Sequence, residues 1–179
     1  SDPTSKEPIV KIRDLNSIYI EAGDTFSVEY QKGLYVDIFP FIDYPTVPRP
    51  WAKKLCKGIS VSYSILHAQH YYSLRSFAEF FYFGMKYALF KGIWAMLCLV
   101  RPKGTYLSNI LINNGYGIMH RKDSVFPLST ITFEGKDFPA PGNVDAYLKD
   151  LYKNYMDIPP KEKQIVHACY IHPELKPLP

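Results

Sequence analysis

The first quarter of the chain alternates polar and apolar residues in the manner of short β-strands. The alternation runs through residues 17–21 and 34–39, with the two-residue period of a strand that has one covered face. Turn residues bound these runs at Ala22-Gly23-Asp24 and Gln31-Lys32-Gly33. We therefore expect residues 9–43 to form part of an antiparallel or mixed sheet.

From residue 49 to residue 100 the spacing of apolar residues becomes helical. Trp51, Leu55 and Ile59 recur one helical turn apart. Pro50 suits the first turn of a helix, where its missing N–H is not needed. Three glycines are the expected breaks, which predicts two or three helices: Gly58, Gly84 and Gly92. The aromatic residues within 71–83 favour a core face, with a ligand-binding surface as the alternative.

The last third of the chain predicts a hairpin followed by a helix. Residues 129–135 and 136–141 have the pattern of two short strands across a Gly135-Lys136 turn. Four residues then share one face of a helix: Val144, Leu148, Leu151 and Tyr155. Pro159-Pro160 should stop this helix, because proline has no N–H to donate. The three zones predict an α+β fold in which a mixed sheet carries a helical insertion near residues 50–100 and a C-terminal helix.

Composition limits the class of protein. The length of 179 residues suits one compact domain. The net charge of +4 is mild, and basic residues are scattered among acidic ones, so we expect no nucleic-acid partner. Cys56, Cys98 and Cys169 are far apart, which predicts free thiols in a reducing compartment. His167, Cys169 and His172 lack the fourth ligand of a structural zinc site, and we interpret them as part of a surface turn.

Residues 77–100 form the longest apolar stretch. Glu79, Lys86 and Lys91 interrupt it, and its last uncharged run, 92–100, is shorter than the ~20 residues that a membrane-spanning helix needs. We expect no span, and a helix lying on a membrane surface is the alternative. Residues 1–8 are polar and acidic, which predicts no signal peptide. The expected location is the cytoplasm, with peripheral contact to the inner membrane as a variant.

Asp37 is a carboxylate at a position where the pattern predicts a buried residue. It lies within the apolar run 34–39, just before a Phe39-Pro40 step. A buried carboxylate is costly unless it has a cation, a hydrogen-bond donor or a metal as its partner. From the residues alone, Asp37 could cap a turn or pair with Arg13 or Arg121.

Four segments of the chain occur in the order seen in LicD-family proteins. They are KIRDLNSIYIE, GLYVDIFPFID, RKDSVFP and TFEGKDFPAPGNVDAYLKDLYKNYMDIPPKEK, followed by His167. The chain therefore resembles this family, which includes bacterial phosphorylcholine transferases and is similar to the catalytic domain of fukutin-related protein. The resemblance covers residues 9–45 and 121–167, and the helical middle resembles nothing specific.

This resemblance implies a nucleotidyltransferase-like fold and an enzyme. The implied reaction moves a phospho-alcohol group, such as phosphocholine, from a CDP-activated donor to a cell-surface glycan such as lipopolysaccharide, capsule or teichoic acid. In such folds an Asp-x-Asp pair and a third carboxylate hold Mg²⁺ or Mn²⁺ against the donor phosphates. Asp37 in VDIFP matches the third position, so the resemblance implies a catalytic, metal-binding role for Asp37.

Other residues are candidates for binding the substrates. Arg13 and Arg121 could hold a phosphate, because the planar guanidinium group contacts two oxygens at once, whereas solvated surface charge is the ordinary alternative. Lys122 favours solvated charge more strongly. Asp43 could support the site or cap a turn.

Aromatic and histidine side chains offer two further interpretations. Phe39, with Phe41 and Tyr44, could surround a quaternary ammonium group such as that of choline, although core packing is the more ordinary role. His120 and His167 could exchange protons near neutral pH, although a lone histidine is usually structural.

The chain departs from the family pattern in two places. The family's Asp-rich motif should precede Lys11, and the chain contains no Asp-x-Asp pair, so the resemblance implies a C-terminal part that is inactive by itself. Residues 152–156 read Tyr-Lys-Asn-Tyr-Met, where relatives usually have Tyr-Gly-Asp-Tyr-Met. The rival function is a non-catalytic glycan- or membrane-associated module that keeps the scaffold.

Overall fold

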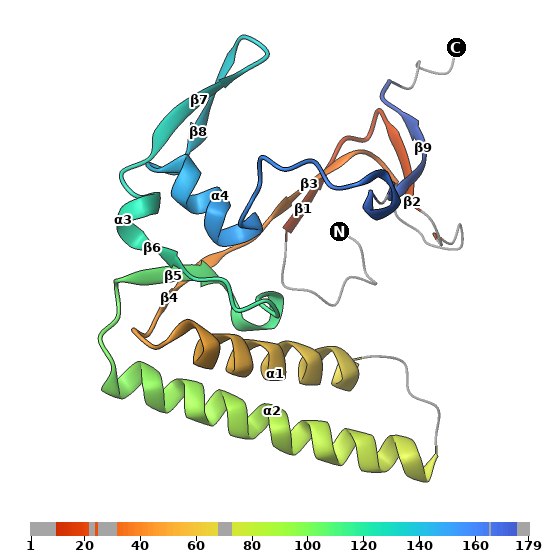
Figure 1. Ribbon diagram of the computed structural model, residues 1–179. Helices are drawn as coiled ribbons and strands as arrows, with labels where there is room; N and C mark the ends of the chain where they lie inside the picture. Colours follow the sequence, from red (N-terminus) through yellow and green to blue (C-terminus); the bar gives the residue numbers. More distant parts are fainter. Residues whose placement is uncertain (1–9, 22–23, 25–31, 68–72, 165, 175–179) are drawn as a thin grey trace. The chain divides into compact units, whose positions relative to one another are not determined.

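The chain forms a mixed α+β structure with small antiparallel sheets (Figure 1). The computed structural model describes residues 10–21, 24, 32–67, 73–164 and 166–174. The chain divides into two compact units: Ser1–Phe39 with Asp157–Pro179 form unit 1, and Pro40–Met156 form unit 2. The α+β class agrees with the sequence-based expectation, whereas the single domain and the nucleotidyltransferase-like fold stay predictions.

Unit 1 consists mainly of two antiparallel strand pairs. Strand β1 (Val10–Arg13) pairs with β3 (Tyr35–Ile38), and β2 (Ile18–Glu21) pairs with β9 (Ala168–His172). A 3₁₀ turn, η2 (Lys161–Lys163), precedes β9. The alternating runs of the sequence predicted β2 and β3. We expected a surface turn at His167, Cys169 and His172, but the last two lie in strand β9, so that expectation was wrong.

Backbone hydrogen bonds connect these strand pairs. The N–H of Asp14 donates to Leu34 O over 2.8 Å, and the N–H of Tyr19 donates to Lys32 O over 2.6 Å. Between them, a Cβ added to Gly33 would lie 1.8 Å from the carbonyl oxygen of Asp14. Only glycine allows two backbones to approach so closely, which explains the glycine at position 33. The Ala22-Gly23 and Gln31 parts of the two predicted turns lie outside the described residues.

Unit 2 begins with a strand that leads into a long helical hairpin. Strand β4 (Phe41–Tyr44) is followed by α1 (Arg49–His67) and α2 (Leu74–Val100). Pro50 lies in the first turn of α1, as expected. Ser73 caps α2, because its side-chain oxygen accepts a hydrogen bond from the N–H of Ser76 over 3.1 Å.

After the hairpin the chain returns to the sheet. Strands β5 (Tyr106–Asn109) and β6 (His120–Arg121) complete a three-stranded antiparallel sheet in the order β4-β5-β6, and a 3₁₀ turn, η1 (Leu111–Asn113), lies between them. A short helix, α3 (Lys122–Val125), follows directly.

A hairpin and a helix complete unit 2. Strands β7 (Ser129–Phe133) and β8 (Lys136–Ala140) pair in antiparallel fashion. Helix α4 (Val144–Tyr152) comes next. Both agree with the sequence, except that the turn lies at Glu134-Gly135 and that α4 ends before Tyr155 and the two prolines. Lys153 ends α4 with φ 58° and ψ −97°, a backbone conformation that favours glycine.

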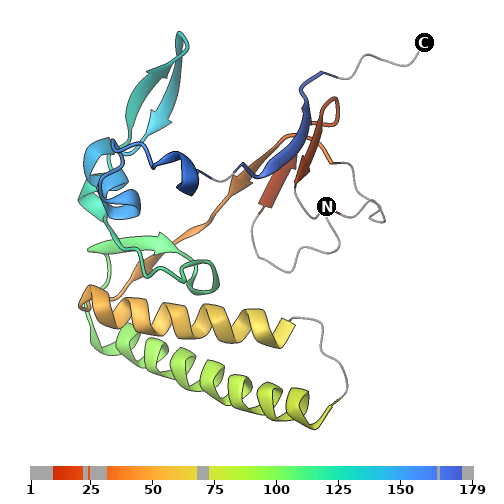
Figure 2. The same cartoon turned by 45° about the vertical axis from the view of Figure 1, so that its right-hand side comes forward.

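The core of unit 2 lies around α1, which contacts both α2 and η1 (Figures 1 and 2). Its buried residues are Tyr44, Val47, Ala52, Leu55, Cys56, Ile59, Trp94 and Met119. The hydroxyl of Tyr44 donates to Asn109 O over 2.7 Å, and Asn114 Nδ2 donates to that hydroxyl over 2.8 Å. Hydrogen bonds thus satisfy the Tyr44 hydroxyl in this core, whereas the buried Ser62 Oγ of α1 has no hydrogen-bond partner among the described residues.

The three glycines of the hairpin do not break its helices, so that expectation was wrong. Gly58 lies inside α1, where an added Cβ would lie 1.9 Å from the Phe90 ring, so it allows α1 and α2 to pack closely. Gly84 and Gly92 lie inside α2 with open space around them. One glycine costs a helix only about 1 kcal/mol relative to alanine, less than the packing of a long helix supplies.

Candidate functional site

The partner of Asp37 is Lys11. The two residues face each other on β3 and β1, and Lys11 Nζ lies 3.1 Å from Asp37 Oδ1. That oxygen is buried and makes no directed hydrogen bond to a described residue, so the contact is an ion pair. The Asp37 side chain is 27% exposed, which makes it partly rather than fully buried.

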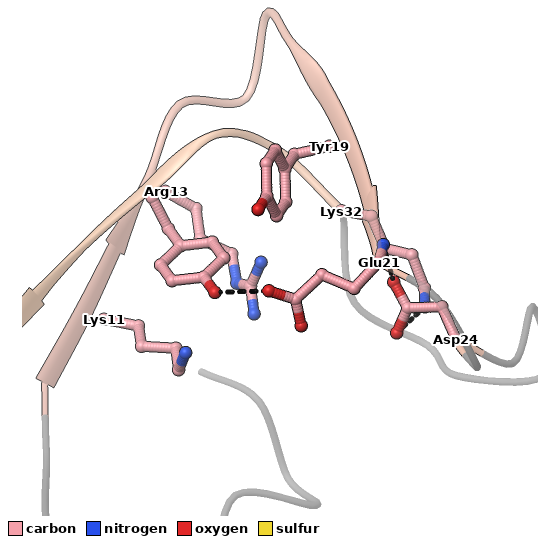
Figure 3. Close-up of a pocket in the computed structure, with 7 residues that line it drawn as sticks. Lys11, Arg13, Tyr19, Glu21, Asp24 and Lys32 are labelled. Carbon is pink, nitrogen blue, oxygen red and sulfur yellow. Dashed lines mark hydrogen bonds and ion pairs between the residues drawn. The ribbon is translucent and has the colours of Figure 1, made fainter. Parts of the chain in front are cut away.

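Next to this ion pair lies a polar cavity of about 150 Å³ (Figure 3). The cavity lies within unit 1, and seven residues line it: Lys11, Arg13, Tyr19, Glu21, Asp24, Lys32 and Tyr35. Three of them are cationic, two are carboxylates and two are tyrosines. Water occupies ~30 Å³ per molecule, so the cavity has room for a small polar group such as a phosphate.

Tyr35 organises the centre of this cavity. Its hydroxyl donates to Glu21 Oε1 over 2.8 Å, and its ring centroid lies 3.9 Å from Lys11 Nζ and 5.0 Å from Arg13 Cζ. Both cations therefore gain from the negative face of the aromatic ring. The hydrogen bond to Glu21, together with burial, raises the pKa of Tyr35 to about 12, so its hydroxyl remains a donor at neutral pH.

Asp24 and Lys32 form a second ion pair in the cavity wall. Lys32 Nζ lies 2.8 Å from Asp24 Oδ1, and the other oxygen of Asp24 accepts a hydrogen bond from the N–H of Glu21 over 3.0 Å. The bond from Lys32 lowers the pKa of Asp24. Arg13 Nη1 donates to Gly33 O over 3.4 Å. These contacts hold the ammonium and guanidinium groups in place around the cavity.

The structure brings Asp37 and Arg13 together, since they lie two positions apart on one face of the β1–β3 pair. Phe39 follows β3, with 42% of its surface exposed. Asp43 and Arg121 belong to unit 2. Sequence reasoning missed Tyr35, Glu21 and Lys32, although Lys32 lies within a predicted turn motif and the other two lie in alternating strands.

Asp43 and Arg121 make ion pairs on the sheet of unit 2. Lys122 Nζ lies 3.1 Å from Asp43 Oδ1. Arg121 Nε donates to Asp123 Oδ1 over 3.0 Å, and all four side chains are well exposed. Solvated surface charge therefore accounts for these residues as well as a binding role does.

His120 is a buried histidine whose partners the sequence did not reveal. Its ring is stacked between Tyr147, with centroids 4.2 Å apart, and Phe41, at 5.9 Å. His120 Nδ1 lies 3.3 Å from Asp150 Oδ2, close in distance but without hydrogen-bond geometry. Burial lowers the pKa of His120 despite this carboxylate. With 1% of its side chain exposed, His120 has no access to a substrate and serves the packing.

Phe41 and Tyr44, which the sequence suggested for a choline site, have packing contacts within unit 2. Tyr44 is fully buried in the core of unit 2, and Phe41 is stacked on His120. Core packing is therefore the role of Tyr44. His167 is exposed in the segment that leads into β9.

No three metal-binding side chains gather anywhere in the described part of the chain. Asp37 is a single carboxylate with an ammonium group against it, and it does not by itself fit a Mg²⁺ centre, which needs several oxygen ligands. The three cysteines are free thiols. Burial raises the pKa of Cys56 to about 11, so this thiol stays protonated and unreactive.

Comparison of the chain with protein-family models, with curated proteins and with solved structures gave no match. The resemblance to LicD proteins, and everything that it implies about activity, remains a prediction.

Proposed function

We propose that the chain is part of a LicD-type transferase, which passes a phospho-alcohol group from a CDP-activated donor to a hydroxyl group of a cell-surface glycan. The observation that supports this proposal best is the polar cavity of unit 1. Lys11, Arg13 and Lys32 converge on it from the strands and the turn that bear the LicD-like sequence, and Asp37 lies against Lys11.

The cavity suits the diphosphate of such a donor. Arginine binds two phosphate oxygens in one plane, whereas lysine supplies a compact positive charge. The carboxylates of Asp24 and Glu21 are engaged by Lys32 and Tyr35, so their main effect is to hold the donors of the cavity in place. A negatively charged ligand would thus meet three cationic groups, of which Lys11 and Lys32 are already paired with Asp37 and Asp24.

The proposed transfer exchanges one P–O bond for another. The oxygen of the glycan hydroxyl attacks the phosphorus atom that carries the alcohol, and the bond from that phosphorus to the bridging oxygen breaks. CMP leaves with the electron pair, and the hydroxyl proton passes to a nearby base or to water. Arg13 and Lys32 would stabilise the negative charge that grows on the leaving phosphate, which is the main task of a protein in such reactions.

The resemblance also implies a bound metal ion, which is a proposal separate from the transfer steps. Asp37 would be one of several oxygen ligands for Mg²⁺ or Mn²⁺, and the others would lie outside the described residues. Because Lys11 already neutralises Asp37, no step above depends on the metal.

The test is Asp37→Asn in the protein expressed from its full reading frame, including any residues encoded before Ser1. Asn is nearly isosteric, so we expect an unchanged melting temperature. It lacks the charge with which Asp37 would hold the cation against the donor phosphates, so the transfer rate should fall at least ~100-fold, the size of effect seen for one electrostatic group in an active site. The control is Asp137→Asn, an aspartate on β8, which should change neither quantity. A less stable variant with a full rate per folded molecule would assign Asp37 to the ion pair alone.

A binding experiment tests the cavity itself. Arg13→Ala should weaken binding of CDP-choline, CDP-ethanolamine or CDP-glycerol at least ~10-fold, since a hydrogen bond to a charged group commonly contributes 1.5–3 kcal/mol. Lys136→Ala, which removes a lysine from β8, is the matched control. If the unmodified protein, Arg13→Ala and Lys136→Ala bind these donors with equal affinity, the cavity is not the donor site.

One observation supports the rival function of a non-catalytic module: helix α2 is long, apolar and exposed. A non-catalytic membrane- or glycan-associated module would show no transfer with any CDP-alcohol, and its reading frame would lack an Asp-rich run before Lys11. Either finding alone favours the module over the enzyme.

A further inference from the structure

Helix α2 is apolar around most of its circumference and yet remains exposed. It has 27 residues, its most apolar 18-residue window has a mean hydropathy of 1.4, and only 6% of that window is buried. A helix of this composition normally lies inside a large core or in a membrane. The described residues of unit 2 do not form such a core around α2.

The exposed residues form one continuous stripe. Six of them recur at helical spacing: Phe77, Phe81, Met85, Leu89, Met96 and Leu99, all between 56% and 86% exposed. The opposite side of α2 packs on α1 through Trp94, Phe90 and Leu97. Within unit 2, both views place α1 on one side of α2 and no other described element on the outer side (Figures 1 and 2).

The charges around this stripe are almost all positive. Helical spacing places Lys86 on one edge of the stripe and Lys91 on the other. Residues 49–103 contain nine basic residues and one acidic residue, which leaves twelve basic and sixteen acidic residues in the remainder of the chain. The helical hairpin is thus strongly cationic although the whole chain is only mildly so.

A cleft between the helices extends this surface. It encloses about 460 Å³ and is lined by Pro50, Trp51, Lys54, Leu55, Phe90 and Ile93. Ile93 neighbours both Leu89 and Met96 on the surface of α2. Trp51, with 63% of its surface exposed, has the amphipathic character of aromatic residues at membrane interfaces.

We propose that the outer face of α2 docks on an anionic lipid bilayer, with the helix lying in the plane of the headgroup region. Its apolar stripe would enter the acyl boundary, while lysines at its edges reach the lipid phosphates. This proposal does not depend on the transferase activity.

Other occupants fit the charges less well. A second copy of the chain would bring two cationic hairpins together with one glutamate each. A helix crossing the bilayer would carry Lys86 into the hydrocarbon, together with the lysines of α1, which is packed along it, and charged groups are costly there. An anionic surface satisfies both the apolar stripe and the lysines.

The experiment is co-sedimentation of the protein with vesicles of phosphatidylcholine, alone or mixed with phosphatidylserine. We expect at least ~10-fold tighter binding to the anionic vesicles, a preference that weakens at high salt. Phe81→Ser with Met85→Ser should abolish binding, and Lys86→Gln with Lys91→Gln should weaken it about five-fold for each lysine. Phe133→Ser, an exposed aromatic residue of β7, is the matched control and should bind normally.

Circular dichroism of each variant separates a loss of binding from a loss of fold. Absence of vesicle binding by the folded protein would overturn the proposal, as would a dimer that the Phe81→Ser, Met85→Ser variant dissociates. Protein that resists extraction from vesicles by alkaline carbonate would overturn it in favour of a spanning helix.

Discussion

The β1–β3 pair of unit 1 and the β4–β5–β6 sheet of unit 2 have the same alternating pattern but cover opposite faces. In the β1–β3 pair the polar face is the more covered one, and the apolar face is open, with Val36 66% exposed. In the other sheet the apolar residues Tyr44 and Leu107 are buried, at 0% and 4% exposed, and Asp43 faces solvent.

This difference separates a polar cavity from a packed core. Covering polar side chains costs free energy unless they are paired, and unit 1 pairs them around a cavity. Unit 2 gains stability by covering apolar surface. The same sequence period therefore produced a polar cavity in one unit and a packed core in the other.

The largest expected effect compares equivalent deletions in the two units. Ile59→Ala removes a fully buried side chain from α1 and should lower the free energy of unfolding by 2–5 kcal/mol, as is typical of core deletions. Val36→Ala removes an exposed side chain from β3 and should change it by about 0.5 kcal/mol or less. Urea unfolding measures both. A large effect of Val36→Ala would show that its face is covered in solution.

The second comparison concerns the face of α2 that packs on α1, next to Gly58 of α1, and the open face of α2, which carries Gly92. Gly58→Ala places a methyl group against the Phe90 ring and should destabilise unit 2 by about 1–3 kcal/mol through overpacking. Gly92→Ala points into open space and should stabilise it by up to about 1 kcal/mol. Thermal unfolding should show shifts of opposite sign, and two destabilised variants would mean that the outer face is packed.

Acid should affect unit 2 before unit 1. Burial lowers the pKa of His120, so the folded state prefers its neutral form, and the resulting stability is lost as pH falls below the ordinary value of 6.5. Lys32 lowers the pKa of Asp24, so the folded state of unit 1 prefers the charged carboxylate. The stability from this preference persists until the pH falls below 3.8.

Fluorescence can follow this difference, because both tryptophans, Trp51 and Trp94, belong to unit 2. His120→Gln should flatten the decline in stability between pH 7 and pH 5, the range in which an ordinary histidine titrates. His172→Gln, on strand β9 of unit 1, should leave it unchanged. An unaltered slope in His120→Gln would mean that another group titrates.

The smallest effect is expected at the end of α4. Lys153 has φ 58° and ψ −97°, a sparsely populated backbone conformation that costs a residue with a side chain about 1–3 kcal/mol. Lys153→Gly should therefore raise the melting temperature, although greater freedom of the unfolded chain offsets part of the gain. Asn154→Gly, at the next residue, should lower it. A lower melting temperature for Lys153→Gly would mean that contacts of the lysine side chain stabilise the protein by more than its backbone conformation costs.

The sequence predicted the elements that depend on local patterns. Strands β2 and β3, the β7–β8 hairpin and both long helices follow from alternation or helical spacing. Strand β9 was missed because its partner β2 is distant in sequence, and only tertiary pairing makes it a strand. The glycine breaks were wrong because a propensity cost of ~1 kcal/mol does not outweigh a helix of 27 residues.

The candidate site was predictable only in part. Asp37 and Arg13 were identified, but Lys11, Tyr35 and Lys32 come together through strand register and a turn, which no local pattern specifies. His120 and Asp150 are likewise distant in sequence. The cationic hairpin was visible in the sequence from the start, but the total charge of +4 concealed it.

The pairing of β2 with β9 also sets the order in which the chain can fold during synthesis. Unit 2 is an uninterrupted segment of the chain, whereas unit 1 needs residues from both sides of it. Ribosomes add about 5–20 residues per second, so β2 leaves the ribosome many seconds before β9 exists. Unit 2 can therefore fold while β2 still lacks its partner, and for that interval the edge of β2 that later pairs with β9 is open to pairing with another strand.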